Sequence, residues 1–154
     1  MTLVLLRHAS AGDRSQWEGE DRRRPLDPKG QRQAEAVVAV LDEFEVATII
    51  SSPARRCVQT VEPLAEARGI PIVIDDSLWE DRAADSIALV MSLVGTDAVV
   101  STHGDNIPSI LQHLAVSEGV DLGAHPDWKK ASSWVLEADQ GHYRSARYLP
   151  PPLV

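Results

Sequence analysis

The sequence predicts an α/β fold, a three-layer α/β/α sandwich with a mostly parallel central sheet and a C-terminal antiparallel hairpin. Short apolar segments alternate along the chain with segments whose apolar residues recur at helical spacing. This alternation is typical of a parallel sheet covered by helices. Two more strand-like segments follow around a tight turn at the end. Because 154 residues suffice for one hydrophobic core, we expect a single domain over residues 1–154.

The first strand and the first helix are expected within the first 41 residues. Residues 3–6 are continuously apolar, as in a strand that is buried on both faces of a parallel sheet. Residues 9–27 are polar and contain glycine and proline, so we expect a long irregular loop of the kind that often carries function. Asp27 and Pro28 then favour a helix start, with Asp27 as the N-cap. Apolar residues follow at helical spacing, namely Ala34, Val37, Val38 and Leu41.

The second and third strands are expected at residues 46–50 and 70–74, with a helix between them. That helix is predicted to begin at Ser51-Ser52-Pro53, and Gly69 provides a C-terminal stop. Its apolar face is formed by Val58, Val61, Leu64 and Ala65.

The last elements follow the same alternation before the chain turns to strands. A third helix carries an apolar face between residues 84 and 94, and a fourth strand over residues 98–100 runs into Ser-Thr-His-Gly. The fourth helix begins near Ile107. A second long loop is expected over residues 117–131. The hairpin strands are expected at residues 132–136 and 142–148.

The charge distribution argues against nonspecific binding to nucleic acid or to an anionic membrane. The formal net charge is −8, which repels polyanions and anionic surfaces. Residues 1–60 are nevertheless balanced, with nine basic and nine acidic residues, whereas residues 61–154 carry six and fourteen. The arginines are therefore concentrated in the first part of the chain, where a local anion site can form.

The sequence contains no segment typical of a membrane span or of a secretory signal. The opening apolar run is too short for either and has no basic residue before it. The single cysteine, Cys57, excludes an intrachain disulfide and is compatible with a reducing compartment. We therefore expect a cytoplasmic protein.

Charged residues follow three of the predicted strands. Arg7 and His8 come after the first strand, Arg56 after the second, and His103 after the fourth. Because ligands bind beyond the carboxyl ends of parallel strands, these residues are expected to meet. Arginine binds two phosphate oxygens at once, and a neutral imidazole is a nucleophile near neutral pH. The set predicts a site for phosphoryl transfer.

This set of side chains needs neither a metal ion nor another cofactor, since the arginines neutralise the phosphate. The sequence has no metal-ligand spacing such as C-x-x-C or H-E-x-x-H, and no P-loop. No C-x5-R loop surrounds Cys57, so we expect this cysteine to be buried in a helix face rather than to act as a nucleophile.

The sequence resembles the histidine phosphatase (phosphoglycerate mutase-like) superfamily in four stretches that occur in the family's order. The Leu-x-Arg-His-Gly stretch appears at residues 5–9, with Ala9 in place of the glycine. The Arg-x-x-Pro-Leu-x-x-x-Gly-x-x-Gln-Ala stretch matches residues 22–34. The Ser-Ser-Pro-Leu-x-Arg-Ala-x-Gln-Thr stretch matches residues 51–60. The Val-Ser-His-Gly stretch matches residues 100–104, with one extra residue.

The resemblance implies a phosphatase and leaves two substrate classes open. The chain length is similar to that of the small SixA-type branch, whose members act on phosphohistidine in proteins. Residues 9–25 are instead similar to a phosphatase domain that is fused to Nudix hydrolases, which favours a nucleotide or another phosphorylated small molecule. A non-catalytic phospho-ligand binder and a mutase are the alternatives. The intact nucleophile disfavours the first, and the lack of room for a lid disfavours the second. The sequence does not predict the oligomeric state.

The resemblance also implies a role for each site residue. His8 would take the phosphoryl group, while Arg7, Arg56 and His103 would hold its oxygens. Glu80 lies in a Leu-Trp-Glu stretch that resembles the family's Leu-x-Glu, and would be the general acid. The other candidates for the general acid are Asp81 and Asp13. Arg22 and Arg24 are expected to form loop ion pairs, with substrate contact as the alternative.

Two departures from the family pattern lie close to the predicted site. Ala9 replaces a glycine, so the turn after His8 has to avoid positive φ. Asp105 follows Gly104 where many members have a small residue, and its carboxylate would repel the phosphate unless it points away.

Overall fold

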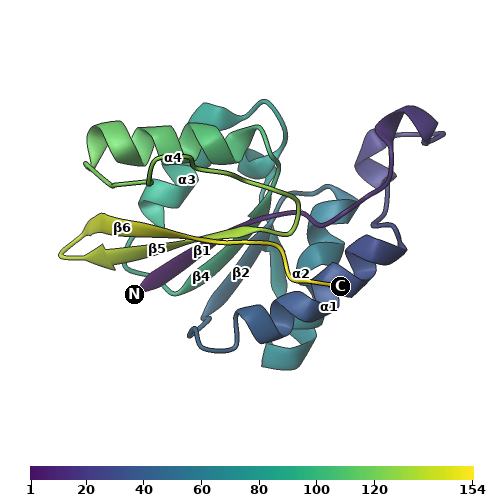
Figure 1. The fold of residues 1–154 in the computed structure, drawn as a ribbon, viewed down its shortest axis with the longest axis horizontal. Coiled ribbons are helices and arrows are strands. Elements are labelled where there is room, and N and C mark those ends of the chain that lie inside the picture. The colour runs from purple at the N-terminus through teal and green to yellow at the C-terminus, as the bar shows by residue number, and fades with distance from the viewer.

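The computed structural model describes residues 1–154 and contains a single six-stranded sheet (Figure 1). The strands are β1 (Thr2–Arg7), β2 (Thr48–Ser51), β3 (Ile72–Ile74), β4 (Ala98–Thr102), β5 (Ser133–Asp139) and β6 (His142–Leu149). Their order across the sheet is β3-β2-β4-β1-β5-β6. The first four strands run parallel, whereas β5 is antiparallel to β1 and β6 is antiparallel to β5. The predicted mostly parallel sheet with a C-terminal hairpin is confirmed.

Helices cover both faces of this sheet, which confirms the predicted three layers. The helices α1 (Pro28–Val40) and α2 (Arg55–Arg68) lie on one face, and α3 (Ala83–Ser92) and α4 (Asn106–Ser117) lie on the other (Figure 1). No helix combines the length and the apolar character that crossing a membrane requires.

The central strand β1 explains why residues 3–6 are all apolar. Leu3 and Leu5 join the hydrophobic core that includes residues of α3 and α4, while Val4 and Leu6 join the core that includes residues of α1 and α2. Successive side chains of a strand point to opposite faces. A strand with a helical layer on each side therefore needs an unbroken apolar run.

The segment between β1 and α1 is less irregular than expected, since it holds two short 3-10 helices, η1 (Arg14–Gln16) and η2 (Asp21–Arg23). The predicted N-cap of α1 is confirmed, because the Asp27 carboxylate accepts a hydrogen bond of 2.7 Å from the backbone N–H of Gly30. A Cβ atom on Gly30 would lie 1.9 Å from the backbone oxygen of Ser10. Glycine thus allows α1 to pack against the chain that follows His8.

Several element boundaries differ from the sequence prediction by a few residues, and two of these differences have a local reason. The helix expected from Ser51 begins at Arg55, because Ser51 still belongs to β2. The third strand begins at Ile72 rather than Ile70. The backbone N–H of Ile70 donates to the oxygen of Ala65 at 3.0 Å, so Ile70 still belongs to the closing turn of α2.

Candidate active site

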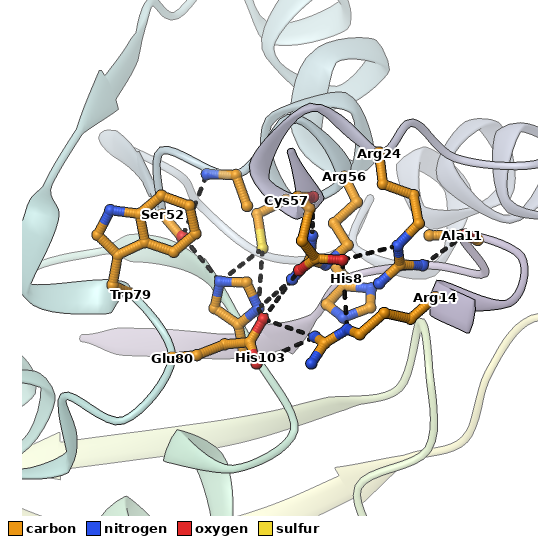
Figure 2. Close-up of polar contacts among 12 residues, drawn as sticks. His8, Ala11, Arg14, Arg24, Ser52, Arg56, Cys57, Trp79, Glu80 and His103 are labelled. Atoms are coloured by element: carbon orange, nitrogen blue, oxygen red, sulfur yellow. Dashed lines mark hydrogen bonds and ion pairs between the residues drawn. The ribbon is translucent and has the colours of Figure 1, made fainter. Parts of the chain in front are cut away.

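The structure brings His8, Arg56 and His103 together at the carboxyl edge of the parallel strands (Figure 2). The rings of His8 and His103 lie 5.6 Å apart between centroids. Nη2 of Arg56 lies 3.5 Å from Nδ1 of His103. Arg7 lines the same cavities as His8. Four residues from three strand ends therefore form one cationic site.

His8 is buried directly after β1, and its hydrogen bonding determines which ring nitrogen is free. Nδ1 lies 2.8 Å from the backbone oxygen of Ala9. Since a carbonyl oxygen only accepts, Nδ1 carries the ring proton and Nε2 keeps its lone pair. Burial lowers the pKa of His8 to about 3, so the ring is neutral at pH 7. A neutral imidazole with a free Nε2 is a competent nucleophile.

Arg56 is completely buried in the first turn of α2 and faces acidic partners. Its Nη1 donates to the backbone oxygen of Asp21 at 2.9 Å, and its Nη2 lies 3.1 Å from the Asp21 carboxylate. The same Nη2 also donates to Oε1 of Glu80. Nε has no partner in the protein. A phosphate could replace these carboxylates, because both ligands present anionic oxygens to the guanidinium.

Arg7 leaves β1 and lies against the backbone of Gly104. Its Nη1 donates to the backbone oxygen of Trp128 at 2.8 Å, and its buried Nε has no partner. A Cβ atom on residue 104 would lie 2.6 Å from Cζ of Arg7. The glycine that follows His103 is therefore required for the position of the arginine.

His103 is held by contacts on several sides (Figure 2). Its Nε2 lies 2.8 Å from Oγ of Ser52, and the ring stacks on Trp79 at 5.9 Å between centroids. Burial, followed by the charge of Arg56, lowers the pKa of His103 to about 4. Its Nδ1 lies 3.7 Å from Oε1 of Glu80. His103 is thus neutral at pH 7, with Nδ1 directed toward Arg56 and Glu80.

Glu80 is the candidate acid that lies beside Arg56 and His103. Besides Arg56 and His103, its carboxylate contacts Nη2 of Arg14 at 2.9 and 3.1 Å (Figure 2). The alternatives have other contacts. The Asp13 carboxylate accepts from the backbone N–H and the hydroxyl of Ser15.

Asp81 and Asp105 form a separate contact at the margin of the site. The Asp105 carboxylate accepts a hydrogen bond of 2.7 Å from the backbone N–H of Asp81. Asp81 has a φ of 59°, a left-handed conformation that is uncommon outside glycine. This contact gives the Asp105 carboxylate a backbone donor of its own.

Two adjoining cavities open against His8. One has a volume of about 430 Å³ and the other about 290 Å³, and they share Arg7, His8 and Arg14. Neither cavity is lined by a hydrophobic side chain. A buried neutral imidazole beside several arginines is an arrangement suited to receive a phosphoryl group.

A comparison of the sequence with family models is consistent with the geometry of this site. A family model described as the histidine phosphatase superfamily (branch 1) matches residues 3–85, which is just over half of the chain. The chain belongs to the histidine phosphatase superfamily. The matched region includes Arg7, His8, Arg56 and Glu80, while His103 lies beyond it.

One curated relative aligns with nearly the whole chain. An 8-oxo-(d)GTP phosphatase from Mycolicibacterium smegmatis is 34% identical over 98% of the chain. The chain spans about half or less of the length of the curated relatives that it matches, 48% of this enzyme and 38% of another.

Two solved structures show the same fold. The protein histidine phosphatase SixA, complexed with tungstate, has a TM-score of 0.76 and 18% identity, over 97% of this chain and 94% of that one. A mycobacterial glucosyl-3-phosphoglycerate phosphatase has a TM-score of 0.68 and 20% identity, over 96% of both chains.

The histidine phosphatase motifs include residues that orient the chain after His8, a role that sequence reasoning did not assign. The backbone N–H of Ala9 donates to Oγ1 of Thr60 at 2.9 Å, and that of Ser10 donates to Oε1 of Gln33 at 2.9 Å. Ala9 does not have a positive φ, as predicted. The Gln33 and Thr60 side chains thus fix the backbone that carries the nucleophile.

Residues of the loop between β1 and α1 complete the site around His8. The Asp21 carboxylate, which contacts Arg56, also lies 3.2 Å from Nε of Arg14 and 3.1 Å from Nε of Arg24. Arg14 and Arg24 line the larger cavity. The loop ion pair expected for Arg24 is present, and Arg24 also lines the larger cavity. Arg22 instead lies over the ring of Trp79 at 5.6 Å and lines neither cavity beside His8.

Proposed function

We propose that this chain hydrolyses phosphoryl groups through a phosphohistidine intermediate on His8, without a metal ion or another cofactor. One observation carries the proposal. Nδ1 of the buried, neutral His8 is engaged by the Ala9 carbonyl, which leaves Nε2 as the nucleophile in a cavity shared with Arg7. This protonation state is the one that attack on phosphorus requires.

The first step transfers the phosphoryl group to the enzyme. Nε2 of His8 attacks phosphorus in line, and the bond from phosphorus to the leaving oxygen breaks with its electron pair on that oxygen. Arg7, Arg56 and His103 hold the three remaining oxygens and stabilise the charge that spreads over them. Glu80 protonates the leaving oxygen.

Substrate binding would also release Glu80 for this role. In the free protein the Glu80 carboxylate accepts a hydrogen bond from Nη2 of Arg56. Phosphate oxygens compete for the same donor, and their binding frees the Glu80 carboxylate. The freed carboxylate takes up a proton from solvent and then faces the leaving oxygen as a carboxylic acid. In the second step the Glu80 carboxylate takes a proton from water. The water oxygen attacks the phosphohistidine, inorganic phosphate leaves, and His8 returns to its neutral form.

Similarity to the 8-oxo-(d)GTP phosphatase extends over 98% of the chain, whereas similarity to a probable phosphoglycerate mutase extends over 52%. The longer match supports a phosphatase over a mutase. It also favours a phosphorylated small molecule, such as a nucleotide, as the substrate. The SixA-like fold makes a phosphohistidine protein the second substrate class to be tested.

The test is a phosphatase assay in the presence of EDTA with an aryl phosphate, nucleotides, sugar phosphates and a phosphohistidine protein. We expect turnover by the wild-type chain and none by the His8→Ala variant. The matched control is His125→Ala, because His125 is an exposed loop histidine. Acid-labile, alkali-stable phosphate should remain on the wild-type chain after quenching. Equal activity of the His8→Ala and wild-type chains, or activity only with added metal, would refute the mechanism.

A further inference from the structure

The larger cavity beside His8 holds more positive charge than a single phosphate needs. It is lined by the cations Arg7, Arg14, Arg24 and Lys130, with Asp13 as the one carboxylate. The chain as a whole has 15 basic and 23 acidic residues, so this concentration is not a consequence of composition. Of the four cations, only Arg7 is assigned to the phosphate that His8 would take. Arg14 is paired with Asp21 and Glu80, which leaves Arg24 and Lys130 for another anion.

Lys130 is held next to the nucleophile by the backbone. The residue after it, Ala131, has a φ of 64°, which is rare for a residue with a Cβ atom. The N–H of Ala131 donates to the backbone oxygens of both Arg7 and His8, at 3.2 and 3.1 Å. The turn that carries Lys130 is therefore fixed to the strand end that carries His8.

The Lys130 ammonium group has no acidic partner, although the neighbouring Lys129 pairs with Asp127 at 3.8 Å. Burial and the charges of Arg7 and Arg24 lower the pKa of Lys130. An unpaired cation that is repelled by its neighbours gains free energy when an anion binds between them.

Arg24 faces the same cavity from the loop after β1. Its side chain is only 8% exposed, and it is fixed by a hydrogen bond from Nε to Asp21 and one from Nη1 to the backbone oxygen of Ala11 (Figure 2). These bonds use Nε and Nη1 and leave Nη2 for a ligand. Arg24 is thus a rigid donor, preorganised in the way that reduces the entropic cost of binding.

We propose that Arg24 and Lys130 form a second phosphate subsite, and that the substrate is a small molecule whose terminal phosphoryl group is bonded through oxygen to another phosphate, as in a nucleoside diphosphate or triphosphate. This inference rests on the proposed function, since it extends the site around His8. The absence of hydrophobic residues from both cavities agrees with a polyanionic ligand rather than a docked protein.

The subsite also has a chemical role in the reaction. As Nε2 of His8 bonds to the terminal phosphorus, the bond from that phosphorus to the bridging oxygen breaks. The electron pair stays on the departing phosphate, which Arg24 and Lys130 stabilise. Water then hydrolyses the phosphohistidine, so the products are inorganic phosphate and a molecule with one phosphate fewer.

The kinetic test compares GDP with p-nitrophenyl phosphate, for the wild-type chain, Lys130→Gln and the control Lys129→Gln. Lys129 suits the control because it is the adjacent lysine and does not line the cavity beside His8. We expect the ratio of kcat/KM for GDP to kcat/KM for p-nitrophenyl phosphate to fall on the order of tenfold in Lys130→Gln, as for a lost hydrogen bond between charged groups. The ratio should stay at the wild-type value in Lys129→Gln. An unchanged ratio in Lys130→Gln would overturn the subsite.

A binding test separates this inference from the proposed function. Methylenediphosphonate, which His8 cannot cleave, should bind the wild-type chain on the order of tenfold more tightly than methylphosphonate by calorimetry. This preference should be lost in Lys130→Gln. Equal affinity for the two ligands in the wild-type chain refutes the subsite, even where p-nitrophenyl phosphate is hydrolysed. Absence of a phosphoenzyme refutes the proposed function, even where the diphosphonate is preferred.

Discussion

The hydroxyl oxygen of Ser52 lies 2.8 Å from Nε2 of His103 and also accepts a hydrogen bond of 3.3 Å from the backbone N–H of Ala54. A hydroxyl can donate one hydrogen bond while it accepts another, so we expect the Ser52 proton to point at Nε2. The ring proton of neutral His103 would then lie on Nδ1, which is 3.7 Å from Oε1 of Glu80. In this arrangement Ser52 makes His103 a donor toward the site around His8.

Replacing Ser52 with alanine should weaken catalysis, because the Ser52 hydroxyl would no longer determine which ring nitrogen of His103 carries the proton. We expect kcat/KM for an aryl phosphate to fall about tenfold in Ser52→Ala, the effect of losing one buried hydrogen bond. Ser51→Ala is the control, because Ser51 is equally buried but donates to the backbone oxygen of Ser52. Nitrogen NMR of the His103 ring should show the proton moving from Nδ1 only in Ser52→Ala. Equal kinetic losses in the two variants would contradict this role.

The backbone of Gly104 should determine the position of Arg7. In Gly104→Ala the new Cβ atom would meet the Arg7 guanidinium at 2.6 Å, so the arginine has to move. We expect kcat/KM to fall about a hundredfold, the effect of removing one donor to the transition state. The control is Gly141→Ala in the hairpin turn, where a Cβ atom meets nothing and a φ of 79° adds backbone strain. Its unfolding temperature should fall while kcat/KM remains at the wild-type value. Wild-type activity of Gly104→Ala would show that Arg7 is dispensable.

Some parts of this site follow from the sequence because they depend on regular patterns. The unbroken apolar run at residues 3–6 requires a strand buried on both faces, and the end of that strand gives the place of His8. His103 follows β4, which pairs with β1 in parallel, so the two histidines have to meet at one edge. Topology alone thus places the reacting groups.

The loop residues could not be predicted because no period determines their direction. Arg14 and Arg24 lie in a polar segment, and only the fold shows that both contact the carboxylate of Asp21. Arg22 was the sequence candidate because it opens a family motif, yet its place in η2 directs it over Trp79. Arg22 and Arg24 are the same residue type in the same loop, and only the direction of each side chain, which the sequence does not give, distinguishes them.

Stability should depend on pH through the two buried histidines. The folded-state pKa values of His8 and His103, about 3 and about 4, lie below the ordinary value of 6.5 because burial disfavours the charged ring. Below pH 6.5 the unfolded chain binds protons that the folded chain does not. The free energy of unfolding therefore decreases as the pH is lowered. The loss should begin near pH 6.5 and continue to about pH 4 for His103 and about pH 3 for His8, at up to about 1.4 kcal/mol per pH unit for each histidine.

Urea unfolding at pH 7, 6 and 5 measures this dependence. The slope with pH should be smaller in His8→Gln than in the wild-type chain, because one buried neutral ring is removed. The exposed His125 provides the control variant His125→Gln, whose slope should match the wild type. Identical slopes in all three proteins would show that the burial of His8 does not control the acid sensitivity.

The general acid can be identified because the kinetic effect of removing it depends on the leaving group of the substrate. Glu80→Gln keeps the shape of the side chain but removes the proton donor. For an alkyl phosphate, whose leaving oxygen needs a proton, we expect kcat to fall about 10²–10⁴-fold. p-Nitrophenolate leaves without a proton, so its first turnover should stay fast while hydrolysis of the phosphohistidine slows. Rapid-quench measurements should then show a burst of p-nitrophenol and an accumulated phosphoenzyme.

Asp13→Asn and Asp81→Asn are the comparison variants, since both residues line cavities beside His8. Neither should produce the burst, because neither carboxylate contacts Arg56, whereas Glu80 does. A burst in Asp13→Asn or Asp81→Asn, with rapid steady turnover of both substrates by Glu80→Gln, would transfer the acid role to that aspartate. The contact between Glu80 and Arg56 would then only hold the empty site together until phosphate arrives.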